Sequence, residues 1–135
     1  MSDKLFLDTN LFVYLISSDM RRKNIVRDII LSDMQVCIST QVLSEFASTC
    51  TRKKLLGPGE CIDIVRVLSD SLAVMPVDAQ TVIKSLELIG THSLSFWDGM
   101  IAAAAILNQC TVLYSEDMQH GYLLENQVRI LNPFV

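Results

Sequence analysis

The chain has 135 residues, half of them hydrophobic, and a formal net charge of −4 at pH 7. This length and apolar content predict one folded domain over residues 1–135 and argue against a disordered chain. The acidic balance argues against a nucleic-acid binder with a generally basic surface, and no apolar run approaches the ~20 residues that a membrane helix needs.

The cysteines and the N-terminal stretch indicate the compartment. Cys37, Cys50, Cys61 and Cys110 each lie in an apolar neighbourhood and form no close-spaced pair of metal or redox type. We therefore expect reduced, buried thiols, as in the cytosol. The opening MSDKLF carries an acid and a base ahead of a short strand-like run, which does not match a secretory signal. A soluble cytoplasmic protein without membrane contact is expected.

Short strand-like runs alternate with longer segments of helical spacing. The strand-like runs are KLFLD (4–8), QVCIS (35–39), LAVMPV (72–77), CTVLYS (110–115) and QVRIL (127–131). Apolar residues at helical spacing predict helices around 25–30, 42–50, 61–68 and 82–89, and a helix after Gly99 that is apolar nearly all round. GPG at 57–59 separates two of these helices, with the proline suited to begin the second. This alternation predicts an α/β fold with a mostly parallel sheet covered on both faces.

Acidic residues follow two of the predicted strands directly. Asp8 ends the first strand in FLDTN, and Ser115, Glu116 and Asp117 end the strand in TVLYSED. In open parallel sheets, ligands bind beyond the carboxyl ends of the strands, so these side chains are expected to face one crevice. Each has a structural alternative, because Asp and Ser are also favoured at helix caps and in turns.

Two predicted helices carry further acids near their N-terminal ends. Glu45, in STQVLSEF (39–46), lies ~60° around the helix from Val42, at the border of the apolar stripe. Asp98, in SLSFWDGMIAAAAIL (93–107), opens the most apolar helix, where a carboxylate is costly unless it is paired, hydrogen-bonded or metal-bound. A capping box from Ser95 to Asp98 is an equally good explanation of that acid.

Four of these acids would form a metal site if they converge. They are Asp8, Glu45, Asp98 and Asp117. Four carboxylates a few ångströms apart do not all stay ionised without a counter-charge, and an all-oxygen site selects Mg²⁺ or Mn²⁺. His92 and His120 lack the spacing of a zinc site and are interpreted as core or surface histidines.

The sequence resembles the PIN-domain nucleases, especially the VapC-type ribonuclease toxins of bacterial toxin–antitoxin systems. The resemblance rests on FLDTNLFVY (6–14), STQVLSEF (39–46), LSFWDGMIAAAA (94–105) and TVLYSEDMQHG (111–121). With the elements between them, these ordered stretches cover essentially the whole chain. The resemblance implies a three-layer α/β/α sandwich around a mostly parallel sheet of four or five strands.

The resemblance also implies an activity and roles for single residues. It implies an Mg²⁺- or Mn²⁺-dependent endoribonuclease that leaves a 3′-hydroxyl and a 5′-phosphate. The acidic quartet of the family falls on the four acids above, with Asp8 and Asp98 as principal metal ligands. Asn10 and Ser115 match the polar residues that support the site. Glu116 falls at a position of variable type, so it either joins the site or faces solvent.

The partners implied are an RNA substrate, a small antitoxin and a second copy of the chain in a homodimer. Exposed apolar side chains around LLGPGECIDIV (55–65) are candidates for the protein contacts. Basic clusters at 21–27 and 52–54 are candidates for phosphate contacts, although solvated helix surface is the common role of such clusters.

Two rival functions remain at this stage. A catalytically inactive PIN-like scaffold that binds RNA or protein would keep the same motifs. A receiver-like phosphoacceptor domain, or a phosphatase with an aspartyl nucleophile, also has an acid after a parallel strand. The receiver needs a lysine that TVLYSEDMQ does not offer, and the phosphatase needs D-x-D where this chain has Asp8-Thr9-Asn10.

Overall fold

Strand β1 (Lys4–Leu7) lies in the middle of the sheet and pairs in parallel with β2 (Gln35–Ser39) on one side and β4 (Val112–Tyr114) on the other. Its last three residues are buried, as expected for a central strand covered on both faces. Beyond these neighbours lie β3 (Ala73–Met75), β6 (Val128–Leu131) and β5 (Leu123–Leu124), in the order β3-β2-β1-β4-β6-β5. Only β5 runs antiparallel to its neighbour.

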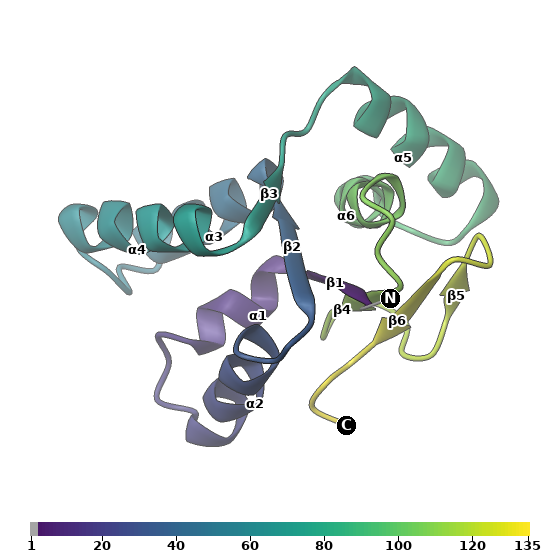
Figure 1. The fold of residues 1–135 in the computed structure, drawn as a ribbon. Helices are drawn as coiled ribbons and strands as arrows, with labels where there is room; N and C mark the ends of the chain where they lie inside the picture. The colour runs from purple at the N-terminus through teal and green to yellow at the C-terminus, as the bar shows by residue number, and fades with distance from the viewer. Residues whose placement is uncertain (1–2) are drawn as a thin grey trace.

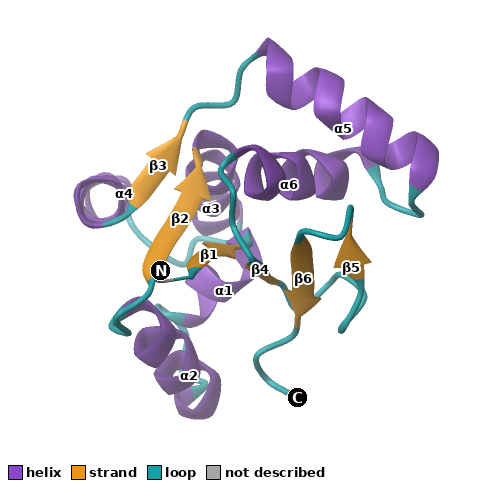
Figure 2. Cartoon of the chain, turned by 45° about the vertical axis from the view of Figure 1, so that its right-hand side comes forward, coloured by secondary structure: helices purple, strands orange, loops and turns teal. Residues whose placement is uncertain are grey.

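The computed structural model describes residues 3–135, which include six helices (Figures 1 and 2). They are α1 (Thr9–Tyr14), α2 (Met20–Ile30), α3 (Thr40–Arg52), α4 (Pro58–Ser71), α5 (Ala79–Thr91) and α6 (Phe96–Leu107). In Figure 1, α5 and α6 lie on one side of the sheet and α1 to α4 on the other. The predicted three-layer α/β/α arrangement with a mostly parallel sheet is confirmed.

All five predicted strands are present, and the sheet has a sixth strand that the sequence did not predict. This strand, β5, has two residues, too few for alternation to be visible in the sequence. Helix α1 was not predicted either, because its six residues are too few to establish a helical period. It begins immediately after Asp8, so the chain passes from the central strand into a helix with a single residue between them.

Helix α6 is the predicted apolar helix, and its residues 99–106 are all buried. Its four consecutive alanines pack beneath α5, next to the sheet, and Gly99 faces Ile89 of α5 at a distance that leaves no room for a larger side chain. The four cysteines are buried and free, as predicted. No helix within residues 3–135 has both the length and the hydropathy to cross a bilayer.

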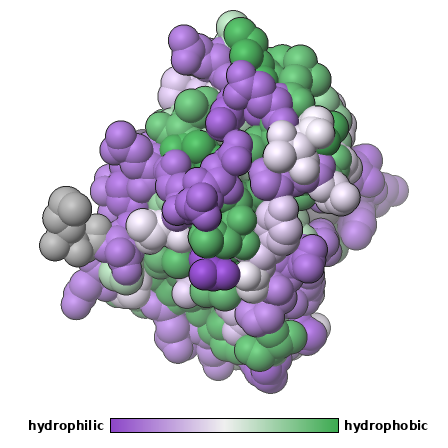
Figure 3. All heavy atoms as spheres, turned by 90° about the vertical axis from the view of Figure 1, so that its right-hand side faces the viewer, coloured by the Kyte–Doolittle hydropathy of each residue, from purple (hydrophilic) through white to green (hydrophobic). Residues whose placement is uncertain are grey.

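Apolar side chains are exposed on two helices away from the carboxyl edge of the sheet. On α4, Ile62 and Val67 are more than half exposed, and on α5 the same holds for Ile83 and Leu86. Figure 3 views the molecule from the side of α5 and β5 and shows hydrophobic patches between hydrophilic ones. The stretch 55–65 is therefore partly surface, as its candidate role in protein contacts requires.

Candidate functional site

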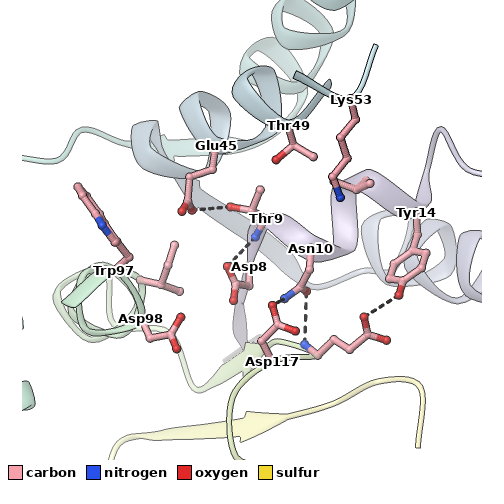
Figure 4. A pocket seen from close by; sticks show the side chains of 13 residues that line it. Asp8, Thr9, Asn10, Tyr14, Glu45, Thr49, Lys53, Trp97, Asp98 and Asp117 are labelled. Carbon is pink, nitrogen blue, oxygen red and sulfur yellow. Dashed lines mark hydrogen bonds between the residues drawn. The ribbon is translucent and has the colours of Figure 1, made fainter. Parts of the chain in front are cut away.

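Five of the six predicted site residues line one cavity of about 430 Å³ at the carboxyl edge of the sheet (Figure 4), and the sixth, Ser115, is buried against Asp8. Its lining includes Asp8, Asn10, Glu45, Asp98, Glu116 and Asp117. The register of the sheet explains why the residues after β1 and those after β4 meet, because Leu7 of β1 pairs with Tyr114 of β4. Asp8 and Ser115, the next residues on each strand, are therefore neighbours.

Asp8 is both the cap of α1 and a wall of the cavity. Its Oδ1 accepts a hydrogen bond from the backbone N–H of Thr9 at 2.7 Å, and its Oδ2 accepts one from Ser115 Oγ at 2.8 Å. The side chain is 6% exposed. The helix cap that the sequence offered as an alternative for Asp8 is thus correct, and Asp8 lines the cavity as well.

Burial of Asp8 raises the pKa of its carboxyl group to about 6. The hydrogen bonds from Ser115 and Thr9 lower this pKa, whereas the negative charges of Asp98 and Glu45 raise it further. The carboxyl groups of Glu45 on α3 and Asp98 on α6 therefore repel the carboxylate of Asp8, which lies between β1 and α1. A cation between them would remove this repulsion and favour ionised Asp8.

Asp98 faces the cavity from the first turn of α6 (Figure 4). Its backbone N–H donates to Ser95 Oγ at 3.2 Å, so Ser95 caps the helix. Among the described residues, no hydrogen bond reaches the carboxylate of Asp98. The capping box is therefore only half formed, and the carboxylate itself is directed to the cavity.

Glu45 is held by two side chains that sequence reasoning missed. Its Oε1 accepts hydrogen bonds from Thr9 Oγ1 at 2.8 Å and from Gln41 Nε2 at 3.4 Å. Gln41 lies one helical turn before Glu45, a spacing that could have indicated the contact. Thr9 is 36 positions away, and only the fold brings it to Glu45.

Asn10 joins α1 to the loop after β4. Its Nδ2 donates to Asp117 Oδ2 at 3.0 Å, and its Oδ1 accepts from the backbone N–H of Glu116 at 3.3 Å. The N–H of Asp117 donates to Ser115 Oγ at 3.3 Å. Asn10 and Ser115 thus orient the acids around them, in the supporting positions that the resemblance implied.

Glu116 lines the cavity but its carboxylate is already engaged. It accepts hydrogen bonds from Tyr14 Oη at 2.6 Å and from Arg22 Nε at 3.3 Å. Arg22 also pairs with Asp19 at 2.9 Å and lies 5.6 Å from the centre of the Tyr14 ring. The carboxylate of Glu116 raises the pKa of Tyr14, because it accepts that hydroxyl's proton in a hydrogen bond. Part of the basic cluster at 21–27 therefore neutralises acids of the protein itself.

The second basic cluster reaches the site. Glu45, Thr49 and Lys53 follow one another at intervals of four along α3 and its C-terminal cap, and all three line the cavity. Arg52 lines a second cavity beside the first. Lys53 belongs to the cluster 52–54 that the sequence offered for phosphate contacts, and the fold brings it to the cavity wall.

The donor set fits a hard divalent cation, since the cavity is lined by carboxylate, amide and hydroxyl oxygens. As the side chains stand, residues 3–135 contain no group of three or more Asp, Glu, His or Cys placed to hold one ion. His92 instead contacts Tyr122, and His120 Nδ1 accepts from the backbone N–H of Asn132. The acids surround the cavity without closing into a single coordination shell.

Comparisons with known proteins identify the family and the fold. The sequence profile of the PIN domain family matches residues 5–121. No curated protein sequence matches significantly. A toxin–antitoxin complex from Klebsiella pneumoniae has a similar fold, with a TM-score of 0.71 and 16% identity over 96% of this chain and 97% of that one.

Two further solved structures share the fold. Mycobacterium tuberculosis VapC20, described as a sarcin–ricin loop cleaving toxin, has a TM-score of 0.68 at 21% identity, over 84% of this chain and 91% of that one. VapBC2 from Rickettsia felis, bound to a fragment of promoter DNA, has a TM-score of 0.69 at 18% identity, over 96% and 99%. At these identities the likeness shows the fold.

Proposed function

Because the chain belongs to the PIN domain family, we propose that it is a metal-dependent endoribonuclease, the toxin of a toxin–antitoxin pair. The observation that carries the proposal is the convergence of Asp8, Glu45, Asp98 and Asp117 on one cavity. Helix capping explains Asp8, but it does not explain why carboxylates from α3, α6 and the loop after β4 should turn toward the same space.

Asp8 and Asp98 would be the principal ligands of an Mg²⁺ or Mn²⁺ ion, with Glu45 and Asp117 completing the shell. Such an ion makes bound water more acidic and offsets charge on the phosphate under in-line attack. The resemblance implies that the products carry a 3′-hydroxyl and a 5′-phosphate.

Residues of this chain would hold the ligands in place. Thr9 and Gln41 restrain Glu45 through its Oε1, which leaves Oε2 to accept a proton from, or orient, the attacking water. Asn10 restrains Asp117, and Ser115 restrains Asp8. Lys53, on the same wall as Glu45, supplies a positive charge for a phosphate of the substrate.

Similar solved structures support the biological setting. One is a toxin–antitoxin complex, another is described as a toxin that cleaves the sarcin–ricin loop, and VapBC2 is bound to a fragment of promoter DNA. We infer that this chain acts on RNA in the cytoplasm, forms a homodimer and is restrained by a small antitoxin. The exposed apolar side chains of α4 and α5 are available for these protein contacts.

Cleavage of a mixed RNA pool tests the proposal. Purified protein is expected to cleave the RNA when Mg²⁺ or Mn²⁺ is present, and EDTA should abolish this cleavage. Asp98→Asn should lower the rate by at least about 100-fold, because it removes a ligand charge without changing shape. Asp63→Asn, at an exposed position of α4 far from the cavity, is the matched control and should cleave normally. Cleavage that survives EDTA, or an intact protein that never cleaves, would contradict the proposal and favour the scaffold.

A further inference from the structure

A second cavity of about 540 Å³ adjoins the acidic one and is lined mainly by one face of α3. The two cavities share three lining residues, Glu45, Thr49 and Trp97, so they form one continuous groove. The remaining lining is made by Thr40, Gln41, Ser44, Ser48 and Arg52, with Val77 and Met100, and more of the exposed surface in this cavity is apolar than polar. Of this remaining lining, the mechanism proposed above uses only Gln41, through its hydrogen bond to Glu45.

Trp97 stands between the two cavities. It is the single tryptophan of the sequence and is 60% exposed, although an indole is a large ring that proteins usually cover. In Figure 4 its ring lies at the rim, beyond the acidic side chains of Glu45 and Asp98. It meets the ring of Phe96 edge to face, at 4.9 Å between centroids.

Gln41 in the wall of the second cavity has an unused acceptor. Its Nε2 donates to the backbone oxygen of Trp97 at 3.3 Å and to Glu45 Oε1 at 3.4 Å. Both partners are acceptors, so the nitrogen must face them, and the orientation of the amide is settled. Its Oε1 is buried and has no hydrogen-bond partner among the described residues. A buried acceptor without a donor is costly, and a ligand with an N–H group would satisfy it.

We propose that this second cavity is a nucleobase subsite for single-stranded RNA, with Trp97 as the stacking platform. The inference rests on the proposed ribonuclease function, which places a phosphate at the acidic cavity. A base attached next to that phosphate reaches the adjoining part of the groove, and its ring stacks on the indole. Its N–H edge faces Gln41, and Arg52 at the far end contacts the following phosphate.

The cavity combines a mainly apolar surface, which suits the face of an aromatic base, with hydrogen-bonding groups and a charge that favour an RNA base over an apolar protein segment. Hydroxyl and amide groups line the cavity on α3, and its one charged residue besides Glu45 is Arg52. The side chain of Arg52 lies back along the helix, with Nε 3.4 Å from Ser48 Oγ. An apolar side chain of a partner would leave the Gln41 acceptor unsatisfied, whereas every RNA base carries an N–H donor.

The fluorescence of Trp97 reports this contact without interference from other tryptophans. Titration of the metal-free protein with a single-stranded oligouridylate should quench the emission in a saturable manner. An abasic oligomer of the same length keeps the phosphates but lacks the rings, and it should quench far less. An equal response to both oligomers would overturn the inference, because it would show charge binding without base contact.

Variants extend the test to affinity and cleavage. Trp97→Ala should weaken oligouridylate binding about tenfold, and Trp97→Phe should retain most of the affinity. Ile62→Ala removes an exposed apolar side chain of α4 that lines neither cavity, and it should bind as wild type. Circular dichroism establishes that each variant is folded, and RNA binding of the variants is followed by anisotropy of a labelled oligomer.

The outcomes separate this inference from the ribonuclease proposal. If the wild type cleaves RNA and Trp97→Ala cleaves with the same KM and kcat, the subsite is wrong and the ribonuclease stands. If the wild type neither cleaves nor binds RNA, both proposals fail. An indole signal that responds only to a protein partner also overturns the subsite. A raised KM in Trp97→Ala, with cleavage retained at saturating RNA, supports it.

Discussion

The carboxyl group of Asp8 illustrates how one residue serves both fold and site. It accepts hydrogen bonds at both oxygens, caps α1 and faces Glu45 and Asp98 across the cavity. In the unfolded chain its pKa is the ordinary 3.8, and in the folded chain it is raised to about 6. The folded state therefore holds this proton more tightly than the unfolded state does.

This difference in pKa predicts that ionisation of Asp8 lowers the free energy of unfolding of the metal-free protein as the pH rises. Its contribution to the free energy of unfolding is most favourable below about pH 4 and is lost as the pH rises through about 6. The loss is about 3 kcal/mol, from the rise in pKa from 3.8 to about 6. Asp8→Asn cannot ionise and keeps the shape, with Oδ1 accepting from Thr9 and Nδ2 donating to Ser115 Oγ in place of the present acceptor, so it should be more stable than wild type at pH 7 by up to about this amount.

Urea unfolding in EDTA at pH 4, 5, 6 and 7 measures the effect. The stability difference between Asp8→Asn and wild type should grow from pH 4 to pH 6 and then level off. Asp63→Asn, exposed on α4, controls for the loss of a charge and should follow the wild-type profile. Parallel profiles for Asp8→Asn and wild type would show that this burial cost is absent.

At the scale of the element, the packing of α6 against α5 fixes where Asp98 points. Gly99, the residue after Asp98, lies against α5, and a Cβ added there would be 2.9 Å from Ile89 Cγ1. In the same pair of helices, Gly90 has no heavy atom within 4 Å of its added Cβ. Gly99 therefore permits the close approach of α5 and α6, whereas the helix packing does not require a glycine at position 90.

Alanine at the two positions should have opposite effects. Gly99→Ala should lower the free energy of unfolding by about 1–3 kcal/mol, because the helices must separate or Ile89 must leave its rotamer. It should also slow cleavage by displacing Asp98. Gly90→Ala should raise stability by about 0.5 kcal/mol through helix propensity. Thermal unfolding of both variants measures this, and an unchanged Gly99→Ala would contradict the close packing.

At the scale of the whole molecule, the site gathers negative charge from both ends of the chain in a protein that is already acidic. The repulsion is offset in part by Lys53, which lines the cavity, and by Arg22, which binds Glu116. Burial and the charges of Asp98 and Glu45 still raise the pKa of Asp8. A divalent cation that binds only the folded chain should therefore stabilise it strongly.

A melting curve with and without Mn²⁺ tests this at once. At a concentration of about 100 times Kd, the ion should add about 2.7 kcal/mol, or raise Tm by about 10 °C for a chain of this size. EDTA should reverse the shift, and Asp98→Asn should reduce it to a small fraction. A shift of equal size in wild type and Asp98→Asn would place the ion elsewhere, and no shift in wild type would remove the metal from the proposal.

Local sequence was sufficient for the elements and for the nature of the site. Period-2 and period-3.6 patterns depend on residues a few positions apart, and for this reason the five parallel strands and the longer helices could be predicted. An acid after a strand has a known place in a parallel sheet, so Asp8 and Asp117 could be assigned to one edge. Elements of two and six residues, β5 and α1, were missed because they are shorter than the pattern that would reveal them.

Tertiary structure alone decided which side chains touch. Asn10 meets Asp117 across 107 positions and Thr9 meets Glu45 across 36, and both contacts depend on strand order and register. The engagement of Glu116 by Arg22, and the groove beside Trp97, likewise arise from segments that no local pattern connects. A sequence encodes the period and the polarity of each element, whereas the distance between two charges exists only once the sheet has aligned their strands.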